Sequence, residues 1–205
     1  MSNIRCRPRP QALAALAVSM GLAALATLAP DPVRASGPSN RLGQVHFKVE
    51  CTEAAQREFN VAMAYYHSFA WGPLGPQIDR VLQADPACGM AHWARVLASL
   101  DNPFVWPGII SAKVLAEGPA GLDAARKAGL KSQRERDYVD ALAAFFKDAG
   151  TAGHRVRAQA LEQALGELAR RHPDDTEAAI LHALVLSANF DPGDKHYTNQ
   201  LKAAA

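Results

Sequence analysis

Residues 59–97, FNVAMAYYHSFAWGPLGPQIDRVLQADPACGMAHWARVL, contain the same pattern of apolar residues twice. Three apolar pairs are separated by the same 34 positions: Phe59 with Trp93, Ala62 with Val96, and Met63 with Leu97. Apolar residues three and four positions apart lie on one face of a helix. A helical face that recurs at this interval indicates stacked helical units, because one helical pair cannot bury its apolar face by itself.

A second spacing repeats further along the chain. Gaps of four, three and five residues separate the members of two sets, Leu74, Ile78, Val81, Pro86 and Leu161, Leu165, Leu168, Pro173. A proline at this distance suits the first turn of a following helix, where the N–H that it lacks has no intrahelical partner anyway. Together the two spacings predict an all-α fold of antiparallel helical hairpins stacked as an α-solenoid.

Start signals place further helices along the chain. Asp85 before Pro86 is expected to cap the helix that contains Trp93. Ser132, followed three residues later by Glu135, forms a capping-box pattern that opens another helix. Apolar residues at helical spacing predict a helix over 154–171, and Pro173-Asp174 begins the next one.

Glycine and proline predict two interruptions. The stretch 71–76, WGPLGP, is expected to break the chain after the first helix and to leave only a short second helix around Ile78. The step Gly118-Pro119 is expected to separate two short helical pieces, over 109–117 and 119–128.

Residues 1–35 have the pattern of a secretory signal peptide. Three arginines precede an almost uncharged Ala/Leu-rich run, and Val33-Arg34-Ala35 resembles a cleavage site. A retained membrane anchor is the alternative, since about 18 apolar residues just span a bilayer. Cleavage leaves a polar leader, 36–50, with a short extended stretch at 45–49, and a helical repeat domain, 51–205. The expected location is the periplasm or the cell exterior, with no membrane attachment.

The composition excludes a collagen-like or disordered chain, a small disulfide-rich protein and a strongly basic nucleic-acid-binding protein. The chain has 205 residues, 49% of them apolar, with 22 basic and 20 acidic side chains, which is ordinary for a globular protein. The first 35 residues hold four arginines and one acid, so the remainder has 18 basic and 19 acidic side chains. Its basic clusters alternate with acids, which indicates solvated helix faces, and no nucleic-acid partner is expected.

Two cysteines, Cys51 and Cys88, remain after cleavage. The sequence has no C-x-x-C, and an exported protein lies in an oxidising compartment, so a disulfide is expected. In stacked hairpins the first helices of successive units run side by side, and each cysteine lies at or just before the start of one. Two unpaired thiols are the alternative.

Six short stretches are spread over nearly the whole of residues 36–205: Leu42–Phe47, Tyr66–Phe69, Asp85–Trp93, Gln133–Tyr138, Arg171–Asp175 and Asp194–Gln200. Together they resemble exported bacterial tetratricopeptide-repeat (TPR) proteins. The resemblance implies a TPR-like α-solenoid and a binding role, and it brings no catalytic residue and no cofactor.

The chain departs from the family pattern in two places. The stretch 71–76 shortens the second helix of the first hairpin. Family members continue for several more repeats, whereas this chain stops at Ala205, inside a helix marked by Tyr197 and Leu201. We therefore expect an incomplete repeat domain, from a fragment or a truncated gene product. An uncapped solenoid exposes an apolar edge, so self-association is expected there.

Three neighbouring residues are the candidate contacts for a partner. Tyr65 and Tyr66 are adjacent on the first helix and cannot both point into one core, so one of them is expected at the concave groove or the seam between repeats. Repeat scaffolds hold peptides in that groove. Tyr65, Tyr66 and His67 are therefore the predicted groove contacts.

Other chemistry has weaker support in the sequence. Met63, His67, Met90 and His92 are ligands that suit copper, which leaves a periplasmic metal- or small-ligand-binding protein as the alternative function. The position equivalent to His67 in the next helix lies nine residues beyond His92, so no metal site is predicted. No hydrolase, zinc-protease or phosphate-loop motif occurs. The sequence predicts a non-catalytic exported scaffold for protein or peptide binding.

Overall fold

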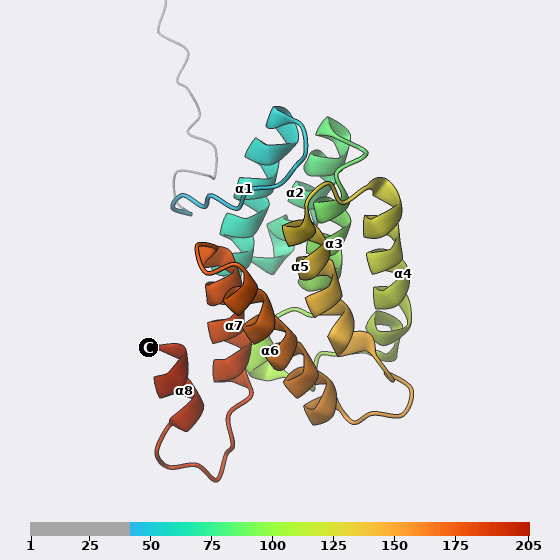
Figure 1. Cartoon of the computed structure of the whole chain (residues 1–205). Helices are drawn as coiled ribbons and strands as arrows, with labels where there is room; N and C mark the ends of the chain where they lie inside the picture. Colours follow the sequence, from blue (N-terminus) through green and yellow to red (C-terminus); the bar gives the residue numbers. More distant parts are fainter. Residues whose placement is uncertain (1–41) are drawn as a thin grey trace, which may run out of the picture. The chain divides into compact units, whose positions relative to one another are not determined.

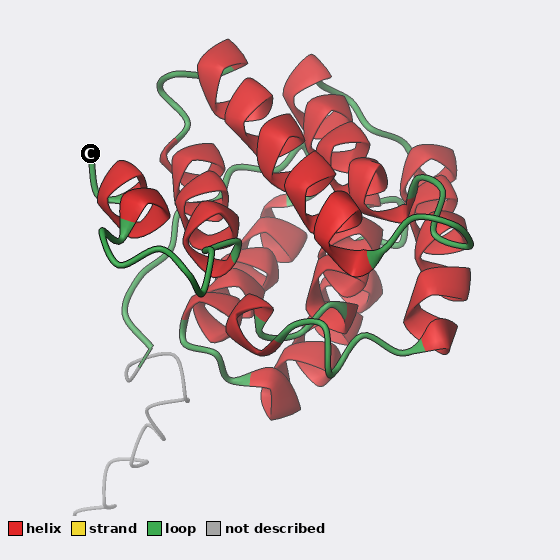
Figure 2. Cartoon of the chain, turned by 90° about the horizontal axis from the view of Figure 1, so that it is seen from below, coloured by secondary structure: helices red, strands yellow, loops and turns green. Residues whose placement is uncertain are grey.

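The computed structural model describes residues 42–205, and this part of the chain is helical, with no strand (Figures 1 and 2). Its helices are α1 Glu53–His67, α2 Trp71–Ala84, α3 Gly89–Ser99, α4 Ala112–Ala128, α5 Gln133–Ala143, α6 His154–Arg171, α7 Thr176–Ala188 and α8 Thr198–Ala203, with short 3₁₀ helices η2 Pro103–Val105 and η3 Ala144–Phe146. The all-α prediction is confirmed for these residues. The predicted signal peptide, 1–35, and residues 36–41 of the leader lie outside the described residues.

The helices pack in chain order. Each helix contacts the helix before it and the helix after it, and α3 also contacts α5. The core joins these pairs through large apolar side chains, among which Phe59 of α1, Trp93 of α3 and Tyr138 of α5 are fully buried. An aromatic group at the centre of three helices fixes their positions, because dense packing leaves little room for displacement.

The start of α5 is formed as predicted. Ser132 Oγ accepts a hydrogen bond from the Glu135 N–H, and the Glu135 carboxylate accepts one from the backbone of Ser132. The predicted bounds of α6, 154–171, are confirmed as well. Helix α5 combines an apolar face with a capping box, whereas the bounds of α6 follow from its apolar periodicity, because Gly153 at its N-cap has no side chain to cap it.

Two predicted interruptions are wrong. Helix α2 begins at Trp71 and continues through Pro73 and Pro76, and α4 continues through Pro119 as one helix. Pro73 is in the first turn, where its N–H would have no partner, and Pro76 and Pro119 are exposed, so water satisfies the carbonyls that they free. Burial of the opposite helix faces outweighs the loss of one hydrogen bond at each site.

The predicted cap of α3 is also wrong. Asp85 follows the last residue of α2, and α3 begins later, with Cys88 at the N-cap position. The Asp85 carboxylate instead accepts hydrogen bonds from the backbone N–H groups of Ala87, in its own loop, and Thr52, before α1. Likewise α7 is capped by Asp175, so it starts two residues later than Pro173-Asp174 suggested.

Candidate functional site

The segment 44–50, which we call the strap, contacts α1, α3 and α5, and we call the surface that these three helices present to it the inner face. Its side chains alternate: Phe47 and Val49 are buried, whereas His46 and Lys48 are exposed. An alternation with a period of two residues is typical of an extended chain. The short extended stretch predicted at 45–49 is thus present, although no strand pairs with it in the described part of the chain, 42–205.

Phe47 places the strap among three helices. Its ring centroid lies 5.3 Å from that of Phe59, 5.6 Å from Trp93 and 5.0 Å from Tyr138. The Arg134 guanidinium lies 4.9 Å from the Phe47 ring centroid, close enough for a cation–π contact. The inner face therefore has a pocket of aromatic rings, filled by an aromatic side chain of the same chain.

Side chains from two helices bind the strap backbone. The Gln56 amide donates to the Phe47 carbonyl at 2.7 Å and accepts from the Val49 N–H at 2.8 Å. From α5, Arg134 donates to the Lys48 carbonyl at 2.6 Å, and Glu135 accepts from the Glu50 N–H at 2.8 Å. These bonds recognise an extended backbone whatever its side chains are.

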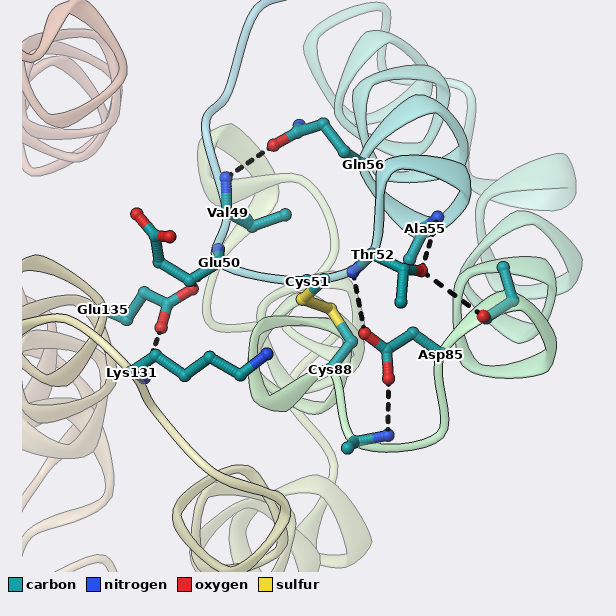
Figure 3. Close-up of a disulfide and its surroundings, with 12 residues drawn as sticks. Val49, Glu50, Cys51, Thr52, Ala55, Gln56, Asp85, Cys88, Lys131 and Glu135 are labelled. Atoms are coloured by element: carbon teal, nitrogen blue, oxygen red, sulfur yellow. Dashed lines mark hydrogen bonds between the residues drawn. A yellow bond between two sulfur atoms is a disulfide. The ribbon is translucent and has the colours of Figure 1, made fainter.

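A disulfide anchors the end of the strap. Cys51 is bonded to Cys88, with Cα atoms 5.2 Å apart, which is the pair expected from the sequence. Thr52, the next residue, caps α1 through its hydroxyl and donates its N–H to Asp85 at 2.8 Å (Figure 3). The start of α1 is thereby linked covalently to the start of α3 and by a hydrogen bond to the residue after α2.

An open cleft of about 770 Å³ lies beside the strap. Its walls are the strap from Gln44 to Lys48, His67 at the end of α1, Arg134, the α6–α7 loop 171–175, and the start of α7 as far as Ile180. Volumes of this order are typical of ligand sites. The cleft is bounded by residues from both ends of the described chain.

Most charged side chains around the cleft are paired, and the exposed Asp174 is the carboxylate of the lining that has no ion pair within residues 42–205. Arg134 lies 2.5 Å from Asp175, and His67 lies 2.8 Å from Glu177. Asp137, buried behind the wall, accepts from Arg171 at 2.5 Å and contacts His172 at 2.7 Å. Because Arg134 and Arg171 each lie against a carboxylate, the cleft has no strong field of one sign.

The pairing shifts several pKa values. Burial would raise the pKa of Asp175, but hydrogen bonds from Arg134 and Tyr138 outweigh it and lower that pKa. Burial likewise opposes hydrogen bonds from Gln133 and His172 at Asp137, and its pKa is also lowered. Burial raises the pKa of Tyr138, whose hydroxyl donates to Asp175 at 2.9 Å. Both carboxylates are therefore held ionised at neutral pH.

The three predicted groove contacts lie in different surroundings. Tyr65 and Tyr66 are both buried, at 7% and 5% exposure. The Tyr66 ring packs edge-on against Trp71 in the seam between α1 and α2, and burial raises its pKa. His67 lines the open cleft. Among the three, His67 is the residue that a partner in the cleft reaches without rearrangement.

The residues of the metal-binding alternative lie largely inside the protein. Met63 and Met90 are fully buried in the core, and His67 is paired with Glu177. Burial, with the charge of Arg95, lowers the pKa of His92. Across residues 42–205, no group of three or more His, Cys, Asp or Glu side chains is arranged to hold a metal ion.

Comparison with known proteins adds no relative: no family model, no curated protein and no solved structure matches the chain. The TPR-like arrangement therefore stays a prediction from the repeat spacing. Within residues 42–205, none of the helices combines the length and apolar character needed to span a membrane.

Proposed function

We propose that this protein is an exported, TPR-like helical scaffold that binds a protein or peptide and catalyses no reaction. One observation carries the proposal: the inner face already holds an extended segment, the strap, through hydrogen bonds from Gln56, Arg134 and Glu135 to its backbone. Helical repeat scaffolds use such faces for peptides. The open cleft beside the strap is the place for a second, external segment.

The paired charges favour binding over catalysis. A general base needs a group free to accept a proton from a substrate. Of the three carboxylates that line the cleft, Asp175 is engaged by Arg134 and Tyr138, and Glu177 by His67. Asp174, the third, is exposed on the loop before α7, and no side chain of residues 42–205 forms a hydrogen bond or ion pair that would position it. These pairs hold the cleft walls in place, which suits recognition, because a rigid site loses little freedom on binding.

A selection experiment tests the binding proposal. A phage-displayed library of random octapeptides is selected on the mature chain, and the affinity of the selected peptides is measured by fluorescence anisotropy. Ile180→Trp fills the cleft from α7, and Val156→Trp places the same side chain at a site on α6 that does not line the cleft. We expect Ile180→Trp to weaken binding about tenfold or more and Val156→Trp to leave it unchanged. Selection that yields no binder, or equal binding by both variants, contradicts the proposal.

Export is tested by the intact mass of the protein from its own host. Cleavage after Ala35 predicts a mass that matches residues 36–205 and a gain of two hydrogen atoms on reduction of the disulfide. A mass that includes residues 1–35 supports a retained anchor, and a mass unchanged by reductant shows that the two thiols are free.

A further inference from the structure

The strap backbone follows a register in which alternate residues face opposite helices. In an extended chain, the N–H and C=O of one residue point to the same side, and those of the next residue to the other. The Phe47 carbonyl and the Val49 N–H both face α1, where Gln56 binds them. The Lys48 carbonyl and the Glu50 N–H both face α5, where Arg134 and Glu135 bind them.

The next pair on the α5 side has no partner. By this register, the His46 carbonyl and N–H and the Lys48 N–H point the same way as the Lys48 carbonyl. Within residues 42–205, no side chain or backbone group bonds to these three groups. His46, Lys48 and Arg134 all line the cleft. The strap thus presents a short open strand edge to the cleft.

We propose that a partner binds by adding an extended peptide segment to this edge, as a second strand beside the strap. The inference rests on the proposed function and names the partner's form: an unpaired extended segment, recognised through its main chain. Strand addition supplies affinity from backbone hydrogen bonds and is tolerant of sequence. The unclaimed carbonyl and two N–H groups match what two residues of an added strand, two positions apart and facing the same way, donate and accept.

The charges around the cleft agree with recognition of a neutral backbone. Arg134, Arg171 and Lys48 are each paired with a carboxylate, and the acids Asp175 and Glu177 each have a cationic or histidine partner. A site for an acidic or basic peptide has several unpaired charges of one sign, whereas here the exposed Asp174 is the single lining carboxylate without an ion pair within residues 42–205. Here the apolar Val45 and Ile180 line the cleft with these pairs, so side chains of varied type are accommodated.

The strap is already rigid where the second strand adds. Phe47 is fully buried on one side of the edge, and the disulfide at Cys51 fixes the end of the strap. An edge held in this way loses little conformational freedom when a peptide pairs with it. Exposed strand edges attract pairing of this kind, which natural proteins otherwise block with charge or bulges.

Proline substitution tests the edge directly. The double variant His46→Pro/Lys48→Pro removes both unclaimed N–H groups, and it keeps every hydrogen bond that the strap makes to the helices. The matched control, His46→Ala/Lys48→Ala, removes the same side chains and keeps the N–H groups. With the octapeptides selected above as probes, we expect the proline variant to bind about tenfold more weakly than the alanine variant.

Amide exchange in the wild-type protein gives a second readout that does not depend on how the proline variant folds. Saturation with a selected octapeptide is expected to slow hydrogen exchange of the Lys48 amide at least tenfold, because an amide in a backbone hydrogen bond exchanges only when that bond opens. A selection without binders overturns the scaffold proposal. Peptides that bind both double variants equally, and leave the Lys48 amide unprotected, overturn strand addition and leave the scaffold proposal standing.

Discussion

Phe47 connects the strap to the helical core at the scale of a single residue. Its ring is fully buried against Phe59, Trp93 and Tyr138. Phe47→Ala leaves a cavity among these rings and is expected to lower the free energy of unfolding by about 3 to 5 kcal/mol. Lys48→Ala, at the exposed neighbouring position, is expected to change it by less than about 0.5 kcal/mol. Urea unfolding measures both, and equal values for the two variants contradict the packing described.

Four ionisable residues make stability depend on pH. Burial and the charge of Arg157 lower the pKa of His154, and the pKa of His92 is lowered as well. Below their ordinary value of 6.5, the unfolded chain binds protons that the folded chain does not, so stability falls as pH falls. The lowered pKa values of Asp137 and Asp175 add a second loss, which begins near their ordinary value of 3.8 and grows toward their folded values.

Urea unfolding over a range from about pH 7.5 to 3 is expected to show both losses. His154→Phe keeps an aromatic ring against Trp106 and Phe145 and removes the titrating group, so the loss near pH 6 becomes smaller. Asp137→Asn is destabilised at neutral pH and loses less stability in acid than the wild type. Identical pH profiles for all three proteins contradict this origin of the pH dependence.

Single residues show why the candidate site was only partly predictable. The extended stretch at 45–49 and the Ser132/Glu135 capping box are visible in the sequence, but nothing local indicates that Glu135 also binds the Glu50 N–H, 85 positions away. Gln56 and Arg134 look like ordinary polar helix residues. Adjacent Tyr65 and Tyr66 predicted that one of them reaches the groove or the seam between repeats. Both are buried, and the Tyr66 ring packs against Trp71 between α1 and α2.

At the scale of the elements, a glycine governs how closely α4 packs. A Cβ atom on Gly118 would lie 2.0 Å from Phe146 Cε1, whereas one on Gly72, in α2, would meet nothing within 4 Å. Gly118→Ala therefore forces η3 away from α4 and is expected to destabilise the protein by about 1 to 3 kcal/mol. Gly72→Ala, the matched control, meets nothing beyond its chain neighbours, and its gain in helix propensity is offset by crowding against the following Pro73, so a change smaller than about 1 kcal/mol is expected. Thermal unfolding compares the two, and a stable Gly118→Ala variant would show that the contact is not tight.

The sequence predicts helical structure along the described chain, but it does not predict the helix ends correctly where prolines occur. The ends of α6 match because periodicity and flanking loops agree. In α2 and α4, local rules indicated a break at Pro76 and Pro119, and packing of the buried faces overrode them. Asp85 was assigned to the wrong helix because its carboxylate binds the Thr52 N–H, 33 positions away, a contact that no local pattern contains.

At the scale of the whole described chain, two long-range links hold the array of helices together. The disulfide joins the starts of α1 and α3, and His67 at the end of α1 contacts Glu177 at the start of α7, 110 positions away. The cleft lies beside the second link, so its shape depends on the entire array. This explains why the spacing of repeats indicated a helical scaffold and could not locate the site.

The disulfide is expected to contribute substantially to global stability. Its cysteines are 37 positions apart, and the chain-entropy model assigns a loop of this length roughly 3 to 4 kcal/mol. Cys51→Ala/Cys88→Ala should therefore unfold at lower urea concentration than the oxidised wild type, and reductant should lower the wild-type midpoint and leave the variant unchanged. A wild-type midpoint that is insensitive to reductant contradicts this contribution.

Exposed apolar side chains in and before α8 predict self-association of the protein. Tyr197 and Leu201 are each 67% exposed, and Phe190 is 45% exposed in the preceding loop. Sedimentation velocity over a concentration series is expected to show larger species for the wild type, and Tyr197→Ser/Leu201→Lys should reduce them. Phe104→Ser/Val105→Ser, which removes exposed apolar groups at η2, is the control and should not. Association of this kind needs a continuous apolar patch, so only the variant that disrupts the patch should reduce it. Equal effects of the two variants would show that the contact does not involve α8. A wild-type protein that stays monomeric at every concentration would exclude self-association.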